Sequence, residues 1–530
     1  MIPFRPAVLS LGLVALGPTT VQAQAATVDG MPDGQPSDWS VLATRASLPR
    51  NLANPLWSFR LLVPPPRGGL FWTGGNAAGL VEELDDALTL FRATATSTRG
   101  TFRRPLDPPA VDQKRLEATS WGNLTPRFAV LGRVVVERQR FDPGTRADEA
   151  EPYPSSPFLT TDTSTTPSRR TRSRLEGVAA WRFGRWAAGL DLGYDALEHE
   201  TTEAGLVRRS RQAMPGAGIG VTFQLASVRL GAVGRLRHRV ETVLMTERAA
   251  DGQVWQLEGY RDVVPINIAQ SYYRRISENV PSFGLGVAGG DERGSWAGFV
   301  ERAAVRERRT RQQQNDPASD RWDADSWTLG ASYRLRRGPW VVFATGLGTA
   351  LSGEGDLALD QSGVIVTARE RLARVGVDAR WAPEGPWEGS ISAEFVHRRR
   401  SQENPLDGIE ATTRSLVPAV RVEALRRVAA AVRVGISAGL TLPTASGVLP
   451  NPAARGIVYQ QLLAPELDYD ARSKSAVWGG VLIEVSLSGV LAGWAAYDGG
   501  GLSPRGAGPT AYGVTGRRTS SRLTVGLRTR

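Results

Sequence analysis

Hydrophobic and polar residues alternate one by one over many short stretches of this chain. Between Leu175 and Phe183, apolar and small residues take the odd positions, whereas the even positions include Glu176 and Arg182. Gly184-Arg185 then supplies a two-residue turn, and the return stretch from Trp186 alternates in the same way. A period of two with a tight turn between two such stretches predicts a β-hairpin.

The spacing of aromatic residues suggests what this hairpin lies in. Trp186 and Tyr194 fall on the same face, eight residues apart, which is about 26 Å at the rise of a β-strand. Strands that cross an outer membrane carry an apolar band of about that height between two aromatic rims. The hairpin is therefore predicted to be transmembrane, with its charged face toward a lumen.

The same alternation recurs along the whole chain after its N-terminal part. It predicts strands near residues 87–97, 113–122, 126–138, 172–183, 186–197, 213–223, 228–239, 281–290, 295–306, 325–335, 340–350, 372–381, 387–398, 415–424, 428–440, 475–486, 490–497 and 516–528.

Short and long connections alternate between these stretches. The short links are 123–125, 184–185, 224–227, 291–294, 336–339, 382–386, 425–427 and 487–489; the long ones are 98–112, 139–171, 198–212, 240–280, 307–324, 351–371, 399–414, 441–474 and 498–515. Short periplasmic turns and long extracellular loops are typical of outer-membrane barrels. The predicted fold is all-β, a transmembrane antiparallel up-and-down β-barrel of about 18 strands (16–18).

Tryptophans collect near the short links. They are Trp121, Trp181, Trp186, Trp296, Trp340, Trp381 and Trp387. Such a collection predicts a periplasmic aromatic girdle. A soluble β-sandwich or propeller is the alternative, but it would bury its tryptophans in a core, and no repeat of propeller length is present.

The N-terminal part divides in two. Residues 1–23 are predicted to be a signal peptide, because Arg5 precedes a short apolar stretch that ends before Val21-Gln22-Ala23. Residues 24–86 form either a periplasmic segment or a small lumen hatch, and residues 87–530 form the barrel. The chain has no cysteine, so disulfides, thiolate metal sites and a lipid-modified cysteine are excluded.

Charge adds little evidence for a nucleic-acid partner. The net charge is +11, but the basic residues are scattered rather than gathered in a stripe with stacking aromatics. No nucleic acid is expected. The predicted location, after signal-peptide cleavage, is the outer membrane, and the expected partners are outer-membrane lipid and lipopolysaccharide, the barrel-assembly machinery and a possible uptake-system partner.

Charged residues on the predicted lumen face are the main candidate site. They are Arg182, Arg229, Arg235, Arg421, Arg433, Glu176, Glu388, Glu394, Glu423 and Glu484. The arginines either line a path for anionic solutes or pair with the carboxylates and fill the interior. Arg398, Arg399 and Arg400 are candidates for contact with lipopolysaccharide phosphates near the outer surface, as is the run from Arg306 to Arg311.

The sequence offers little for catalysis. His199, His238 and His397 are the only histidines, and a shared metal site on the outer rim is the weaker of two interpretations, the other being rim hydrogen bonds. Glu82-Glu83 and Asp85-Asp86 are interpreted as an exposed cluster at the barrel mouth, and Gly499-Gly500-Gly501 as part of an outer loop. No catalytic residue, cofactor or metal is predicted, and the protein is not expected to be an enzyme.

From about Gly75 to the end, the chain resembles a family of uncharacterised outer-membrane β-barrels, a domain of unknown function. The matching features are Gly75-Asn76-Ala77-Ala78-Gly79-Leu80, the strand pair from Trp121 to Arg138, Pro157-Phe158-Leu159-Thr160-Thr161-Asp162-Thr163 and Phe183-Gly184-Arg185-Trp186. More loosely it is similar to porins and hydrophobic-substrate channels. The resemblance implies a barrel and a location, without a known substrate. Many such barrels end on an aromatic residue, whereas this chain ends Leu527-Arg528-Thr529-Arg530.

The expected function is therefore passage or uptake of a small solute. The alternative is a non-conducting barrel that serves as a surface anchor, an adhesin or a partner of another uptake protein.

Overall fold

The protein is described by a computed structural model. It describes residues 69–83, 87–101, 103, 107–142, 158–162, 167–201, 207–246, 254–258, 264–266, 271–291, 293–313, 316–356, 364–382, 385–405, 408–448, 464–506 and 515–529. The predicted signal peptide lies outside these residues, as do Asp85 and Asp86.

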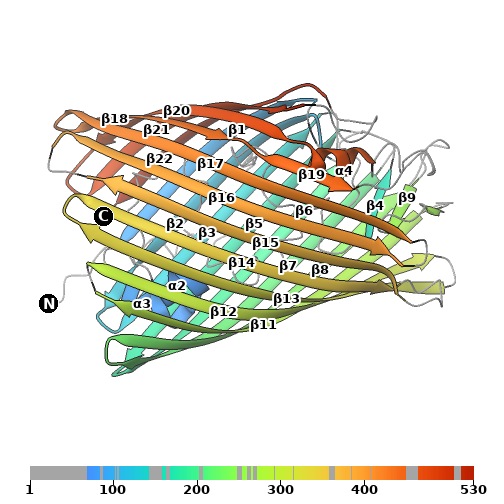
Figure 1. The fold of residues 1–530 in the computed structure, drawn as a ribbon, viewed down its shortest axis with the longest axis horizontal. Coiled ribbons are helices and arrows are strands. Elements are labelled where there is room, and N and C mark those ends of the chain that lie inside the picture. Colours follow the sequence, from blue (N-terminus) through green and yellow to red (C-terminus); the bar gives the residue numbers. More distant parts are fainter. Residues whose placement is uncertain are drawn as a thin grey trace, which may run out of the picture.

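One large antiparallel sheet accounts for most of the described chain (Figure 1). Its strands are β1 (Leu88–Gly100), β2 (Ala110–Thr125), β3 (Phe128–Phe141), β5 (Ser168–Phe183), β6 (Trp186–Thr201), β7 (Val207–Leu225), β8 (Val228–Thr246), β11 (Ser271–Gly290), β12 (Gly294–Gln313), β13 (Asp316–Arg337), β14 (Trp340–Asp356), β15 (Val364–Trp381), β16 (Trp387–Asn404), β17 (Ile409–Ala429), β18 (Val432–Thr441), β19 (Thr444–Val448), β20 (Lys474–Ser486), β21 (Leu491–Pro504) and β22 (Arg518–Thr529).

The sheet closes on itself into a barrel. Each strand pairs with its neighbours in the order of the chain, and β22 pairs back onto β1, with Phe91 opposite Leu527. β18 and β19 lie on either side of Leu442-Pro443, and both pair with β17, so together they act as one strand of the barrel. The nineteen strands of the sheet therefore form an 18-stranded barrel. The predicted fold class is confirmed, and each of the eighteen predicted stretches corresponds to one strand of this barrel.

The strands extend farther at the long-loop end than the sequence pattern predicts. β13 begins at Asp316 rather than near residue 325, and β17 begins at Ile409 rather than near residue 415. Much of the predicted loops 307–324 and 399–414 is therefore strand, and Gly499-Gly500-Gly501 lies in β21 rather than in a loop. Above the bilayer the outward face is polar, while Val305, Trp322 and Ala324 are buried on the inner face, so pairing continues after the outward apolar pattern has stopped.

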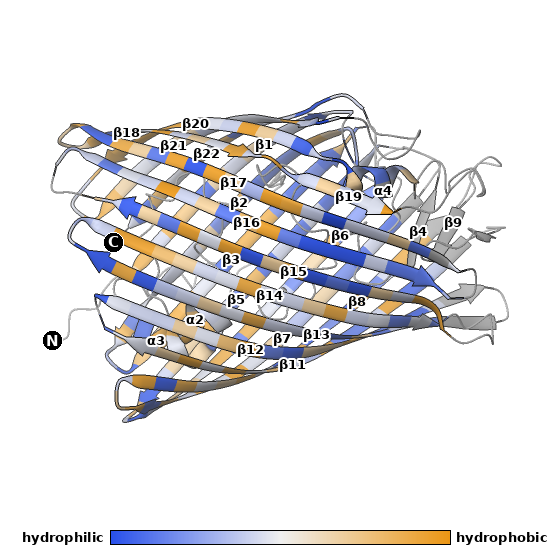
Figure 2. Cartoon of the chain, in the orientation of Figure 1, coloured by the Kyte–Doolittle hydropathy of each residue, from blue (hydrophilic) through white to orange (hydrophobic). Residues whose placement is uncertain are grey.

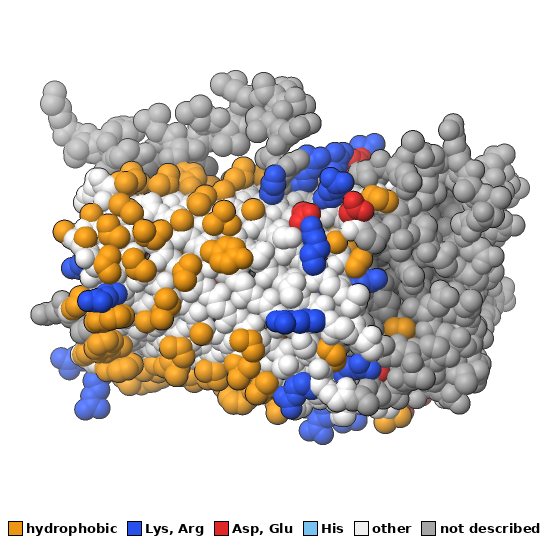
Figure 3. All heavy atoms as spheres, turned by 90° about the horizontal axis from the view of Figure 1, so that it is seen from above, with side chains coloured by type: hydrophobic (Ala, Val, Ile, Leu, Met, Phe, Trp, Pro, Cys, Tyr) orange, Lys and Arg blue, Asp and Glu red, His pale blue; other side chains and the backbone are white. Residues whose placement is uncertain are grey.

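The outer surface is apolar near the short turns and charged toward the long loops (Figures 2 and 3). On β6, Trp186, Leu190, Leu192 and Tyr194 are all exposed on one face, as the alternation predicts. This surface would be unfavourable in water, and it matches the lipid-facing band of a membrane barrel.

Aromatic side chains line the rim at the short turns. Exposed girdle members are Trp181, Trp186, Trp296, Trp340 and Trp387. Trp340 and Trp381 sit opposite each other with ring centroids 6.4 Å apart. Trp121 departs from the prediction: it packs against the inner apolar cluster, because odd positions of β2 point inward.

Further elements lie inside the barrel or at its long-loop end. β4 (Phe158–Asp162), β9 (Val254–Glu258) and β10 (Val264–Ile266) form a small sheet that joins two different outer loops. α4 (Ala464–Ala471) packs on β17 and β19. Near the short turns lie α2 (Leu70–Gly74), η3 (Ala77–Gly79) and α3 (Leu80–Glu83). No helix among the described residues is both long enough and apolar enough to cross a bilayer.

Candidate functional site: the lumen and the segment inside it

Residues 69–83, here called the inner segment, lie against the inner wall of the barrel. α2 contacts β11, β12 and β13; η3 contacts β5, β6 and β7; and α3 contacts β3 and β5. Leu70, Ala78 and Leu80 are almost fully buried. Since a chain of this length has no core of its own, this burial comes from contact with the barrel.

The apolar side chains of the inner segment join a cluster on the inner wall. Phe71, Ala78 and Leu80 belong to the same buried cluster as Leu131 of β3 and Val178 of β5. The lumen near the short turns is therefore apolar on this side, although the lumen face of a barrel is usually polar.

A strip of glycines on the wall makes room for the inner segment. Gly189, Gly220, Gly231 and Gly286 lie on β6, β7, β8 and β11, and the register places Gly189 opposite Gly220 and Gly231 opposite Gly286. A Cβ added at any of them would collide with Leu70, Asn76, Ala77 or Ala78. A glycine inside a strand often marks close approach of another backbone, and this glycine strip fits that role.

Asn76 attaches the inner segment to the backbone of the wall. Its Nδ2 donates to the carbonyl oxygens of Val221 and Ala232, at 3.1 and 3.0 Å. Those two residues are direct partners across β7 and β8. The Oδ1 of Asn76 accepts from the backbone N–H of Ala78 and caps η3. One amide thus fixes both the inner segment's local fold and its position.

Two glutamates of α3 complete the attachment. Glu82 pairs with Arg229 at 2.6 Å and lies 3.6 Å from Arg182. Glu83 is 3% exposed and accepts the backbone N–H of Phe71 at 3.0 Å. The interpretation of Glu82-Glu83 as an exposed cluster is therefore wrong, because Glu82 pairs with arginines of the barrel wall and Glu83 is buried against the backbone of Phe71.

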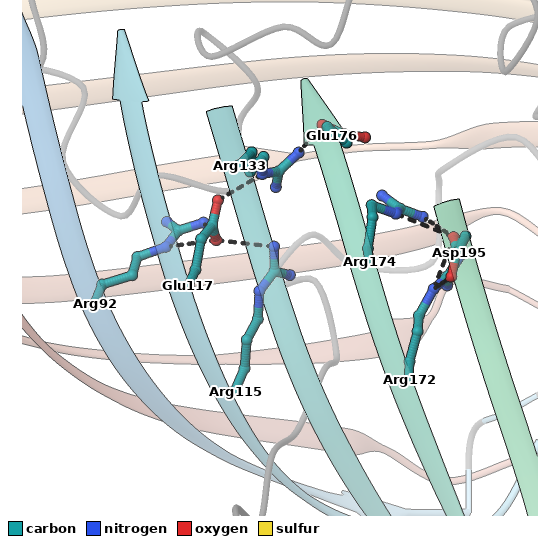
Figure 4. Close-up of polar contacts among 8 residues, drawn as sticks. All are labelled: Arg92, Arg115, Glu117, Arg133, Arg172, Arg174, Glu176 and Asp195. Carbon is teal, nitrogen blue, oxygen red and sulfur yellow. Dashed lines mark hydrogen bonds and ion pairs between the residues drawn. The ribbon is translucent and has the colours of Figure 1, made fainter. Parts of the chain in front are cut away.

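A network of charged side chains covers part of the inner wall of the barrel (Figure 4). This charge lattice consists of Arg92, Arg115, Glu117, Arg133, Arg172, Arg174, Glu176 and Asp195. Glu117 accepts from Arg92, Arg115 and Arg133, each at 2.9 Å. Asp195 accepts from Arg172 and Arg174, at 2.6 and 2.7 Å.

The composition of the charge lattice is uneven. Among its eight residues, five guanidinium groups face three carboxylates. Strands β1, β2, β3, β5 and β6 contribute them, and the lattice begins just beyond the apolar cluster, since Arg133 is the next inward residue after Leu131. The same wall also carries Glu137, buried directly opposite Arg115, and Asp191 on the inward face of β6, so further carboxylates offset this excess.

The ten predicted lumen residues all carry contacts inside the barrel. Arg235 pairs with Glu301 and also donates to the carbonyl of Gly74 in the inner segment, both at 2.9 Å. The remaining pairs are Arg182 and Arg229 with Glu82, Arg421 with Glu423, Arg433 with Glu388 and Glu484, Glu176 with Arg133, and Glu394 with Arg374. The sequence leaves two roles open for these arginines, a path for anionic solutes and pairing with carboxylates. Their contacts are those of the second role.

The three predicted lipopolysaccharide contacts do not share a surface. Arg398 is buried against Glu370 at 3.0 Å, and Arg400 lies 3.9 Å from Asp470 of α4. Only Arg399 is exposed on the outer face. Successive residues of a strand point to opposite sides of the sheet, so a run of three cannot face lipid together.

The histidines do not form a metal site. His199 is buried on the inner face beside Phe141, whereas His238 and His397 hydrogen-bond to Asn279 and Arg414. Within the described ranges, no group of three or more His, Cys, Asp or Glu side chains is placed to hold a metal ion. Rim hydrogen bonds account for His238 and His397.

A closed antiparallel barrel with an apolar outer band, an aromatic rim and a charged interior is an integral outer-membrane β-barrel. No protein-family model matches the chain, and no curated protein matches it significantly. Membership of the uncharacterised barrel family therefore stays a prediction.

Solved structures of low similarity share the barrel. The chain is similar to the siderophore receptor PiuA of Acinetobacter baumannii, with 8% identity, a TM-score of 0.38 and coverage of 83% of this chain and 81% of that one. It is also similar to the unliganded ferric citrate transporter FecA, with 10% identity, a TM-score of 0.41 and coverage of 83% of this chain and 78% of that one. A third similar structure is a mutant of the monoaromatic hydrocarbon channel TodX, with 9% identity, a TM-score of 0.31 and coverage of 86% of this chain and 92% of that one. At these values the likeness carries no argument about cargo, and the class of protein rests on the barrel itself.

Proposed function

We propose that this protein passes a small solute across the outer membrane, and that the inner segment is a hatch that closes the lumen near its periplasmic end. The observation that carries the proposal is the fitted attachment of the inner segment: the glycine strip removes side chains where its backbone lies. A barrel that served only as an anchor would have no need for such a recess.

The strength of the attachment supports a hatch that can move. The inner segment is held by hydrogen bonds from Asn76, by ion pairs of Glu82 and by apolar contacts, all of which are reversible. A barrel of eighteen strands is wide enough to contain an aqueous lumen. The charge lattice beside the inner segment supports a polar solute rather than a hydrocarbon.

The test is single-channel conductance in planar bilayers. The full chain is compared with a double variant, Asn76→Ala with Glu82→Gln, which removes the attachment to Val221, Ala232 and Arg229. Losing a hydrogen bond to a charged partner costs about 1.5–3 kcal/mol, so the hatch of the double variant should be displaced often. We expect rare openings in the parent protein and frequent, larger openings in the variant.

The matched control is Asp325→Asn, which also removes a carboxylate from an arginine partner, Arg302, but on the outer face. It should conduct as the parent does. Correctly folded barrels that stay silent in the parent, the double variant and a chain lacking residues 24–86 would overturn the proposal and favour the anchor or partner alternative.

A further inference from the structure

The outer face of the barrel carries three arginines side by side on neighbouring strands. The register places Arg371 of β15 opposite Arg399 of β16, and Arg399 opposite Arg414 of β17. All three are exposed on the outward face. Directly opposed residues in an antiparallel pair have Cα atoms about 4.5–5.5 Å apart, so three positive charges lie within about 10 Å of one another. This set is called the arginine row.

The arginine row has no carboxylate partner among the described residues. Arg414 donates from Nε to the Nε2 of His397 at 3.1 Å, and this acceptor is an imidazole rather than a carboxylate. The outward carboxylates on β16 and β17 are Glu403 and Glu410. Each lies four residues from the arginine of the row on its own strand, which is about 13 Å at strand rise. Like charges directly opposite one another destabilise a sheet, so the arginine row lowers the stability of the folded protein when no ligand is bound to it.

Several other outward arginines at this end of the barrel pair with carboxylates. Arg99 pairs with Asp112, Arg169 with Glu200, Arg209 and Arg211 with Glu198, Arg302 with Asp325, and Arg321 with Asp323. The arginine row differs from these pairs because its three arginines face one another across three neighbouring strands.

The height of the row suggests its ligand. Val375 and Phe395, four residues below Arg371 and Arg399 on the same face, are more than half exposed and belong to the apolar band. Ala350 and Ser446 flank the row in the neighbouring strands, and both are small. Figure 3 shows the same order on the face that it draws, with hydrophobic side chains first and arginines or lysines beyond them.

We propose that the arginine row binds the phosphate groups of lipopolysaccharide, with the acyl chains of that lipid against Val375 and Phe395. Guanidinium groups bind phosphate oxygens with paired hydrogen bonds. The row lies where the apolar band ends, which is where the headgroups of the outer leaflet begin. A bound phosphate would relieve the repulsion among the three arginines.

The test measures lipopolysaccharide that copurifies with the full-length protein from outer membranes. A triple variant, Arg371→Gln with Arg399→Gln and Arg414→Gln, is compared with a control triple, Arg99→Gln with Arg209→Gln and Arg302→Gln. Both lose three outward charges, but only the first removes the row. Since each arginine near an anionic membrane surface contributes about fivefold to binding, we expect at least about a tenfold loss of bound lipid in the row variant and little loss in the control.

A second measurement identifies the source of the phosphate. The parent barrel is refolded with native lipid A, with dephosphorylated lipid A or with phosphatidylglycerol, and retained lipid is quantified. Retention of native lipid A alone supports the proposal. Equal retention of phosphatidylglycerol, equal loss in both triple variants, or full retention in the row variant would overturn it. If the triple variant does not fold, Arg399→Gln alone is compared with Arg302→Gln under the same criteria.

Discussion

At the scale of single residues, the glycines of the strip decide whether the inner segment fits. A Cβ at Gly231 would lie 2.8 Å from both Asn76 Nδ2 and Leu70 Cδ1, whereas a Cβ at Gly234, on the same strand, has open space around it. Gly231→Val should displace the inner segment at a cost of about 1–3 kcal/mol. Gly234→Val should be neutral. Protease cleavage between residues 69 and 83 checks this: faster cleavage in both variants or in neither would contradict it.

The sequence predicted which face many residues occupy but not what they touch. The alternation placed all five candidate arginines on the inner wall, because side-chain direction in a strand follows from position alone. The partners of Glu82 and Glu83 lie on strands and helices that the local pattern does not relate to them, so their burial was missed. The glycines at positions 189, 220, 231 and 286 were a usable signal, since glycine weakens a strand unless something approaches it closely.

At the scale of an element, β6 shows how the lipid-facing band limits substitution. Leu190 lies midway between Trp186 and Tyr194 on the outer face, so Leu190→Arg should destabilise the folded barrel by about 2–4 kcal/mol, the cost of a charge at the bilayer midplane. Ala196→Arg, on the same face beyond Tyr194, should cost about 0–1 kcal/mol. Urea titration of folded barrel in liposomes measures both; equal costs would mean that the band is placed wrongly.

The strand ends were the least predictable part of each element. The sequence pattern located every barrel strand within the membrane, where the face toward the lipid must be apolar. It did not locate the outer half of β12 and β13, because the pattern is reversed there. Arg308 and Arg321 face each other on the outer side, whereas Trp322 is fully buried on the inner side. These strand ends are stabilised by backbone pairing and by a buried apolar cluster on the inner face, to which Val305, Trp322 and Ala324 belong.

At the scale of the whole molecule, the barrel depends on the seam between β1 and β22. Deleting residues 518–530 would leave the edges of β1 and β21 unpaired, and unpaired backbone is not tolerated within the bilayer. We expect the truncated chain to lose the heat-dependent shift in gel mobility that a closed barrel shows. A chain truncated only at Arg530 should keep it. A retained shift after deletion of β22 would show that another strand can close the barrel.

The position of the inner segment has a consequence for the order of assembly. α3 ends at Glu83, five positions before β1 begins, while α2 contacts β11, β12 and β13. Most contacts of the inner segment therefore lie on strands that precede β14 in the chain, and its apolar cluster also includes Leu425, Leu482 and Trp494 of later strands. Docked in this way, residues 69–83 would hold the first half of the sheet in a curved form, which brings β1 toward the position where the last strand arrives. The segment proposed as a hatch would then also serve as an internal template while the wall is being built.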